Sequence, residues 1–233
     1  MRMKISKKEF LILQINDSLF PIGSYSHSYG LETYIQKGIV HDEKTAERYL
    51  RMKLRYSFMY TDLLAVKLSY EAATKGDIYK LEELEDIMEA SRIPEEIRCA
   101  SRKLGSRFVK TLFCMDPSWK QGIFEKYVSI RTGKTICHPC AYGVFCAARE
   151  IPEEEILAAF LYAQASAAVT NCVKTIPLSQ SSGQKILFSL VPLFEEILEL
   201  IKETGEDMLC LSAPGFDVRS IEHEQLYSRL YMS

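Results

Sequence analysis

The chain has 233 residues, of which 47% are hydrophobic and 26% charged, with a formal net charge of −2. This ordinary globular composition can fill a sizeable core, and the balanced charge excludes the basic surface typical of nucleic-acid binding. No run approaches about 18 uninterrupted apolar residues, so no membrane span is expected. The N-terminus lacks the apolar stretch of a signal peptide, and seven irregularly spaced cysteines fit free thiols, so a cytoplasmic location is predicted.

The first distinctive segment in the chain is 20–32, Phe-Pro-Ile-Gly-Ser-Tyr-Ser-His-Ser-Tyr-Gly-Leu-Glu. Pro21 restricts φ and Gly23 allows backbone angles closed to other residues, so the segment is predicted to be a shaped loop that leads into a helix. Such a loop either turns the chain or presents a recognition surface, to which Tyr25 and His27 would contribute as candidate partner-binding residues. For His27 we favour a structural, hydrogen-bonded ring, with a transient nickel contact as the alternative.

Helical periodicity dominates the next hundred residues. Apolar residues recur at steps of three and four along 59–73; this helix is predicted to stop at Gly76, and the next to begin at Asp77. A second apolar stripe, 97–115, follows Pro94 and two glutamates, which suit the first turn of a helix.

Strand signals are scarce, since no period-two run lies between turn residues. The sequence therefore predicts an all-α fold, a helical bundle of about ten helices that forms one domain over residues 1–233. The four histidines are scattered and no hydrolase motif surrounds them, so a non-catalytic protein is expected.

The segment Cys137-His138-Pro139-Cys140 carries the strongest competing chemistry. Two thiols in C-x-x-C spacing with an imidazole between them can bind a soft divalent metal or cycle to a disulfide. Pro139 is predicted to begin a helix, whose dipole would stabilise a cysteine thiolate. No second ligand pair lies nearby, and buried free cysteines are common. A metal-binding or thiol-redox protein that uses Cys137, His138 and Cys140 remains the alternative function.

Two later helices have unusual composition. The segment 156–170 is rich in alanine around Tyr162, so neighbouring elements can approach it closely; it is predicted to be either a core helix or an interface helix. Pro192 lies inside the helical pattern 185–202, where the missing N–H predicts a kink.

The last segment, about 217–233, is richer in interface-forming residues than a solvated tail would be. Spacing of four between Tyr227 and Tyr231 would place both rings on one face of a helix, with Arg229 on another side. We therefore predict a docking tail that orders when a partner binds. Its candidate partner-binding residues are Tyr227, Arg229, Leu230 and Tyr231.

Three segments resemble one known family. The segment 20–32 closely resembles the N-terminal signature of the urease accessory protein UreF family. The run 171–184, Asn-Cys-Val-Lys-Thr-Ile-Pro-Leu-Ser-Gln-Ser-Ser-Gly-Gln, is similar to a family run that ends in Pro-Leu-x-Gln-x-x-Gly-Gln, and the tail 224–233 also agrees. The resemblance touches the start, middle and end of the chain, so it covers nearly all of it.

The resemblance implies a helical homodimer without catalytic residues, cofactor or metal site of its own. Such a protein binds a UreD-type accessory protein (UreH in some organisms) and recruits the GTPase UreG, and together they insert nickel into apo-urease. Tyr162 would then lie at the dimer interface. The tail would dock beside the loop Pro21–Tyr25, with Arg229 donating hydrogen bonds to that loop.

Overall fold

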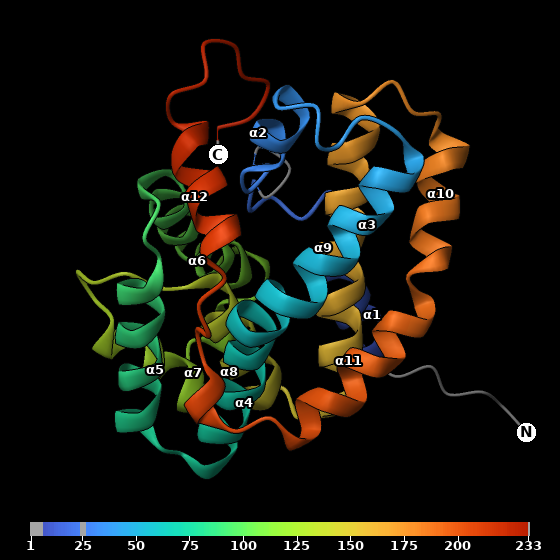
Figure 1. Ribbon diagram of the computed structural model, residues 1–233. Coiled ribbons are helices and arrows are strands. Elements are labelled where there is room, and N and C mark those ends of the chain that lie inside the picture. Colours follow the sequence, from blue (N-terminus) through green and yellow to red (C-terminus); the bar gives the residue numbers. More distant parts are fainter. Residues whose placement is uncertain (1–6, 24–26, 233) are drawn as a thin grey trace, which may run out of the picture.

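The computed structural model describes residues 7–23 and 27–232 of the chain. Within these ranges the secondary structure is helical and contains no strand, which confirms the all-α fold class (Figure 1). The α-helices are α1 (Lys7–Ile15), α2 (Leu31–Gln36), α3 (Glu43–Lys53), α4 (Leu64–Lys75), α5 (Ile78–Ser91), α6 (Glu95–Met115), α7 (Gly122–Ile130), α8 (His138–Ala148), α9 (Glu153–Thr175), α10 (Gln180–Ser189), α11 (Val191–Glu203) and α12 (Pro214–His223). The other helical segments are η2 (Leu54–Leu63), η3 (Pro117–Trp119) and η4 (Glu206–Met208).

Helix α8 occupies the centre of the core, and its residues 138–146 are all buried. Helix α4 approaches it so closely that a Cβ at Gly143 would collide with the carbonyl oxygen of Val66. Buried hydrophobic side chains from Ile12 to Ile201 form one continuous cluster around it. One cluster of this extent is what a single domain requires.

Several helix boundaries follow the predicted signals. Gly76 ends α4 with a left-handed φ of 72°, and the Asp77 carboxylate accepts the backbone N–H of Lys80 at 3.0 Å to begin α5. Helix α6 begins directly after Pro94, with Ile97 on its buried face. These caps confirm the predictions made from glycine, aspartate and proline.

At Pro192 the prediction is wrong in one respect. The chain forms two helices rather than one kinked helix, because α10 ends at Ser189 and α11 begins at Val191. Leu190 joins them, and Pro192 lies in the first turn of α11, where its missing N–H has no helical partner to lose.

Between α3 and α4 the chain forms the π-helix η2, which the sequence pattern did not indicate. The helical period continues through this segment, so the apolar spacing alone predicts an unbroken α-helix. π-Helical segments are rare, and those that occur are often found at functional sites.

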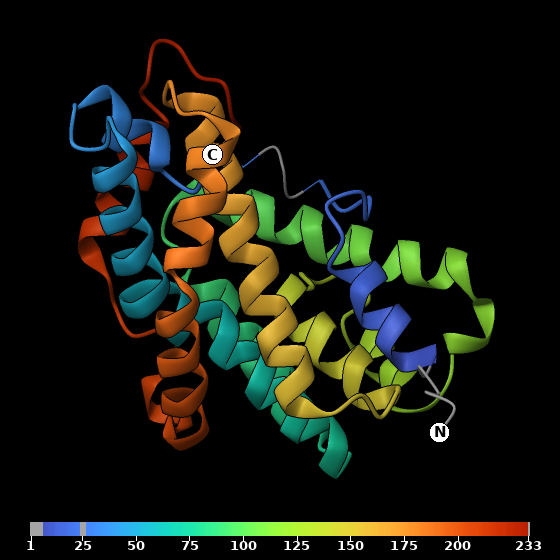
Figure 2. The same cartoon turned by 90° about the vertical axis from the view of Figure 1, so that its right-hand side faces the viewer.

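Helix α9 packs along α10 and α11 (Figure 2). Among the described residues it is the one helix whose length and composition would allow it to cross a membrane. Its Phe160 and Leu161 are buried, whereas most of its alanines are only partly buried. Helix α9 therefore belongs to the core on one side and faces outward on the other.

Candidate partner-docking site

The C-terminal tail returns to the body of the protein and is fixed on helix α2. The buried carboxylate of Glu32 accepts the backbone N–H of Leu230 at 2.7 Å and that of Tyr231 at 3.0 Å. The side-chain amide of Gln36, one turn further along α2, donates to the carbonyl of Ser228 at 2.8 Å. Figure 1 shows this loop beyond α12 and its return to α2. The tail is thus ordered in the isolated chain, whereas the sequence predicted order only with a partner.

His223, at the end of α12, contacts two of the glutamates that hold the tail. Its side chain is fully buried; Nε2 lies 3.0 Å from Glu32 Oε2 and Nδ1 lies 2.7 Å from Glu96 Oε2. Each ring nitrogen of His223 therefore faces one carboxylate oxygen. Glu96, on α6, also pairs with the guanidinium of Arg229. Two glutamates and one histidine therefore join α2, α6, α12 and the tail.

The tail exposes one of its tyrosines and buries the other. Tyr231 is 7% exposed, while the side chain of Tyr227 is fully exposed. The predicted aromatic face of a helix is wrong, because α12 ends at His223 and the tail beyond it is not helical. The backbone N–H groups of Leu230 and Tyr231 are committed to Glu32 and so are not available to helical carbonyls.

The predicted contact of Arg229 with the loop is only partly described. Tyr25 lies in the segment 24–26, outside the described residues. In the described part of the chain the guanidinium pairs with Glu96 on α6, a partner that the sequence did not suggest.

His27 lies at the edge of a groove that the tail closes. His27 is 5% exposed, and its backbone carbonyl accepts a hydrogen bond from the side-chain amide of Asn171 at 2.9 Å. Burial, followed by the nearby charges of Lys103 and Arg107, lowers the pKa of His27. The groove, with a volume of about 340 Å³, is lined by His27, Glu95, Glu96, Cys99, Ala100, Lys103, Glu224 and Met232. The structure thus brings together His27 and the tail, which the sequence predicted as separate parts of one docking surface.

Tyr162 lies on the outward side of α9. Its side chain is 53% exposed, and its ring packs edge-on against Phe194 of α11 with centroids 6.4 Å apart. Partly buried alanines flank it on the same helix. An exposed aromatic among small residues suits a protein interface, and the dimer role of Tyr162 remains a prediction.

The competing segment Cys137–Cys140 lies deep in the core at the start of α8, as the proline predicted. Burial raises the pKa of both Cys137 and Cys140, which disfavours the thiolate. The predicted thiolate stabilisation by the helix dipole is therefore wrong, because desolvation outweighs it. Burial also lowers the pKa of His138 to about 4, so its ring is neutral at pH 7.

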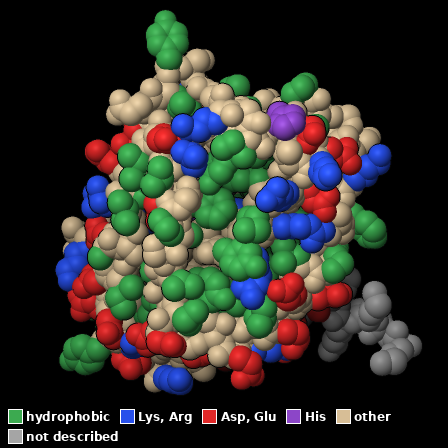
Figure 3. Space-filling model, in the orientation of Figure 1, with side chains coloured by type: hydrophobic (Ala, Val, Ile, Leu, Met, Phe, Trp, Pro, Cys, Tyr) green, Lys and Arg blue, Asp and Glu red, His purple; other side chains and the backbone are tan. Residues whose placement is uncertain are grey.

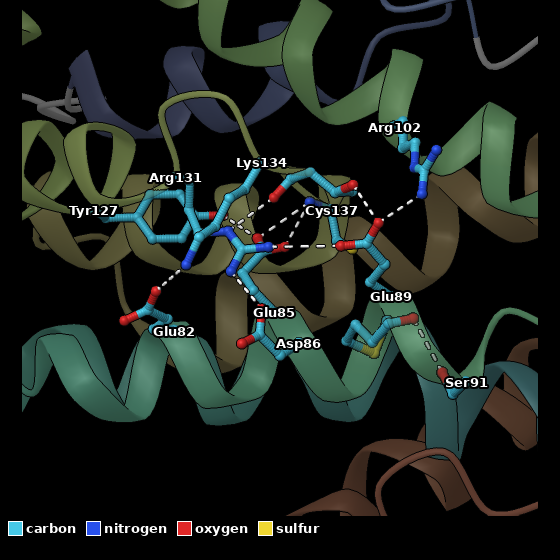
Figure 4. Close-up of polar contacts among 12 residues, drawn as sticks. Glu82, Glu85, Asp86, Glu89, Ser91, Arg102, Tyr127, Arg131, Lys134 and Cys137 are labelled. Carbon is cyan, nitrogen blue, oxygen red and sulfur yellow. Dashed lines mark hydrogen bonds and ion pairs between the residues drawn. The ribbon is translucent and has the colours of Figure 1, made fainter.

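A buried carboxylate, that of Glu85, lies beside this segment and binds its backbone (Figure 4). Glu85 reaches from α5 to accept the backbone N–H of Cys137 at 2.9 Å and the hydroxyl of Tyr127. Burial raises the pKa of Glu85 to about 7, against the opposing effect of these hydrogen bonds. In the described residues no group of three or more His, Cys, Asp or Glu side chains is arranged to hold a metal ion. The geometry here is that of a buried polar contact within the core.

Sequence reasoning missed Glu32, Glu96 and the role of His223. Glu32 closes the distinctive segment 20–32, and His223 is one of only four histidines, so both were visible. Their contact joins positions 191 residues apart, which no local pattern encodes.

These features define a helical protein with a C-terminal tail that packs over a buried contact of one histidine with two glutamates. A family model described as UreF matches residues 40–191. Curated proteins named "Urease accessory protein UreF" are similar over nearly the whole chain. One from Bacillus sp. strain TB-90 is 34% identical over 95% of this chain and 97% of its own length. Another, from Actinobacillus pleuropneumoniae serotype 3, is 35% identical with the same coverage. The chain therefore belongs to the UreF family of urease accessory proteins.

Proposed function

We propose that this protein is a non-catalytic component of the urease maturation machinery that acts in the cytoplasm through docking surfaces. In this proposal it binds a UreD/UreH-type accessory protein, recruits the GTPase UreG and modulates its activity, and thereby supports nickel insertion into apo-urease. The membership in the UreF family supports the urease context. The ordered tail carries the proposal, since it holds exposed side chains in a fixed position beside the groove.

The exposed part of the tail fits the anchor of a protein interface. The side chains of Tyr227 and Leu230 are exposed, while hydrogen bonds to side chains of α2 hold the backbone of the same segment in place. A partner that covers these side chains gains apolar burial without the entropy loss of ordering the tail. Preorganisation of this kind is favourable for affinity.

The test uses Arg229→Ala in co-purification with the UreD and UreG homologues. Loss of the Arg229–Glu96 pair loosens the tail, and removal of an arginine anchor weakens binding by about 2 kcal/mol or more. The expected result is a folded protein that no longer retains the GTPase on size-exclusion chromatography. Arg48→Ala, at an exposed position on α3, is the matched control. Unchanged complex formation by Arg229→Ala would refute the role of the tail.

We further propose that the outward side of α9 forms the homodimer interface. Its partly buried alanines and the exposed ring of Tyr162 allow close approach of a second copy. Tyr162→Asp would bury a charge in that interface, so we expect a monomer by light scattering. Tyr79→Asp, at an 88% exposed position on α5, should leave the dimer intact. A dimer that persists in Tyr162→Asp counts against this interface.

A further inference from the structure

A second cavity, with a volume of about 310 Å³, lies apart from the groove under the tail and shares no lining residue with it. It is enclosed by η2, the turn between α5 and α6, the start of α8 and the segment 210–213 before α12. Figure 3 shows a hollow near the centre of this face, with hydrophobic side chains around it and basic side chains beside it. Neither the family membership nor the proposed docking function assigns a role to this cavity.

Unusual backbone conformations gather at its wall. Tyr29 and Cys210 line the cavity with φ of 53° and 60°, and they are two of the three non-glycine residues with positive φ in the described part of the chain. The π-helix η2 contributes Ser57, Phe58 and Asp62 to the same wall. Each such conformation costs free energy and persists where the surrounding structure enforces it, most often at functional sites.

Two residues of the cavity wall carry buried hydrogen-bonding atoms without a protein partner. Among the described residues, Arg92 Nε and His138 Nε2 are buried and form no hydrogen bond within the chain. Both residues line the cavity. The Arg92 guanidinium is held in place because its Nη2 lies 2.9 Å from Asp62 Oδ1. An unpaired buried donor of this kind is destabilising unless a ligand or water satisfies it.

Lys53 adds a second cation to the wall. Its ammonium lies 4.7 Å from the centre of the Phe216 ring, and within the described ranges it forms no ion pair with a carboxylate. Burial lowers the pKa of Lys53 to about 8; Asp62 and Asp217 oppose this shift and the charge of Arg92 adds to it. Lys53 and Arg92 are thus two cations in one cavity, which Asp62 and Asp217 also line.

The Nε–H of Arg92 still lacks an acceptor in this wall. Asp62 and Asp217 also line the cavity; Asp62 already accepts from Arg92 through Oδ1 and from Thr61 through Oδ2 at 3.0 Å, and Asp217 is only partly buried. The apolar part of the wall includes Leu54, Phe58, Ile93, Ile97, Leu104 and Leu211.

We propose that this cavity binds a small organic monocarboxylate, whose carboxylate accepts hydrogen bonds from Lys53 and Arg92 while its hydrocarbon part lies against Phe58, Ile97 and Leu104. The volume suits a ligand at the small end of the range for protein pockets. Charge-assisted hydrogen bonds to the two cations supply specificity, and burial of the hydrocarbon part supplies affinity. This inference does not depend on the proposed role in urease maturation.

Calorimetric titration of the purified full chain with sodium hexanoate at pH 7 tests the proposal. Hexanamide, of similar size but without charge, is the ligand control. We expect hexanoate to bind at least about tenfold more tightly, since each charge-assisted hydrogen bond is worth that factor or more. Equal affinity for hexanoate and hexanamide, or no heat from hexanoate at millimolar concentration, would overturn the proposal. If inorganic phosphate binds as tightly as hexanoate, the proposed contact of a hydrocarbon part with the apolar wall is wrong.

Two variants locate the binding site. Lys53→Met should weaken hexanoate binding about tenfold or more, whereas Lys44→Met, at an exposed position on the same helix, should not. Arg92→Lys keeps a cation beside Asp62 and removes the Nε–H, so it should weaken binding without unfolding the protein. Melting curves verify the fold of each variant. Equal affinity of Lys53→Met and Lys44→Met would place any bound carboxylate elsewhere and refute this site.

Proton uptake gives an independent readout. A carboxylate beside Lys53 favours its charged form, so hexanoate binding at about pH 8.5 should take up protons. The uptake appears as a binding enthalpy that depends on the ionisation enthalpy of the buffer. It should vanish in Lys53→Met, and a buffer-independent enthalpy in the unmodified protein would contradict the contact.

Discussion

The Nε2 atom of His223 lies 3.0 Å from Oε2 of Glu32, which fastens the last helix to the second. The same carboxylate also holds the backbone of the tail through Leu230 and Tyr231. One buried acidic group therefore sets the position of α12 and of the docking segment.

Removal of this carboxylate should release the tail. In Glu32→Ala the backbone N–H groups of Leu230 and Tyr231 lose their acceptors, so we expect their hydrogen exchange to become at least about tenfold faster. Mass spectrometry of the C-terminal peptide measures this rate. Glu155→Ala, at an exposed position on α9, should leave the rate unchanged. Full protection of the tail in Glu32→Ala would show that other contacts hold it.

Tyr227 should matter for binding and not for folding. Its side chain is fully exposed, so Tyr227→Ala should change the free energy of unfolding by less than about 0.5 kcal/mol. The same variant should weaken the complex with the UreD homologue by about 2 kcal/mol, if Tyr227 is an interface anchor. Urea titration and surface plasmon resonance measure the two quantities. Unaltered affinity would assign the exposed ring no role at that interface.

Glu85 should make stability depend on pH between about 4.5 and 7. Burial raises its folded pKa to about 7 from the model-compound value of 4.5, so in this window the folded state binds more protons than the unfolded state. The favourable contribution is complete below pH 4.5 and is lost as pH rises to 7, by on the order of 3 kcal/mol.

Comparison with Glu85→Gln isolates this contribution. The variant cannot ionise, so its free energy of unfolding relative to the unmodified protein should rise between pH 4.5 and pH 7. Urea titrations at several pH values measure the difference, and Glu83→Gln, at an exposed position on the same helix, serves as control. A pH-independent difference would show that Glu85 ionises normally in the folded protein.

Close packing around α8 predicts opposite effects of two glycine substitutions. A Cβ at Gly105 would collide with the carbonyl oxygen of Ile136, so Gly105→Ala should destabilise the fold by about 1–3 kcal/mol. Gly215, on α12, has no atom within 4 Å of the same position, and Gly215→Ala should be neutral or stabilising by up to about 1 kcal/mol. Thermal melts compare the two, and a stable Gly105→Ala protein would mean that α6 can move away from α8.

The sequence predicted the fold where local chemistry decides it. Gly76 and Asp77 place a helix boundary because a left-handed cap and a side-chain acceptor act within a few residues. At Pro192 the missing N–H predicted an interruption of the helix; the structure has two separate helices there instead of a kink. The π-helix η2 leaves no mark in the apolar spacing, because its register depends on the elements packed around it.

For the candidate docking site, the sequence indicated residues but not the contacts between them. Tail composition and the position of His27 indicated a binding surface, and both now border one groove. Tyr231 binds inward and Tyr227 outward because Glu32, nearly two hundred residues away, captures the backbone between helix and terminus. Helical periodicity assumes that each N–H finds a carbonyl four residues earlier, and here a side chain takes that role.

Of the seven cysteines, only Cys99 and Cys114 are exposed, and both lie on α6. Cys99 borders the groove beneath the tail, and Cys114 lies about four helical turns further along. The natural chain thus offers two thiols for maleimide dyes, one beside the docking surface and one remote from it. With Cys114 changed to serine, fluorescence from the remaining label would report movement of the tail and arrival of a partner in real time.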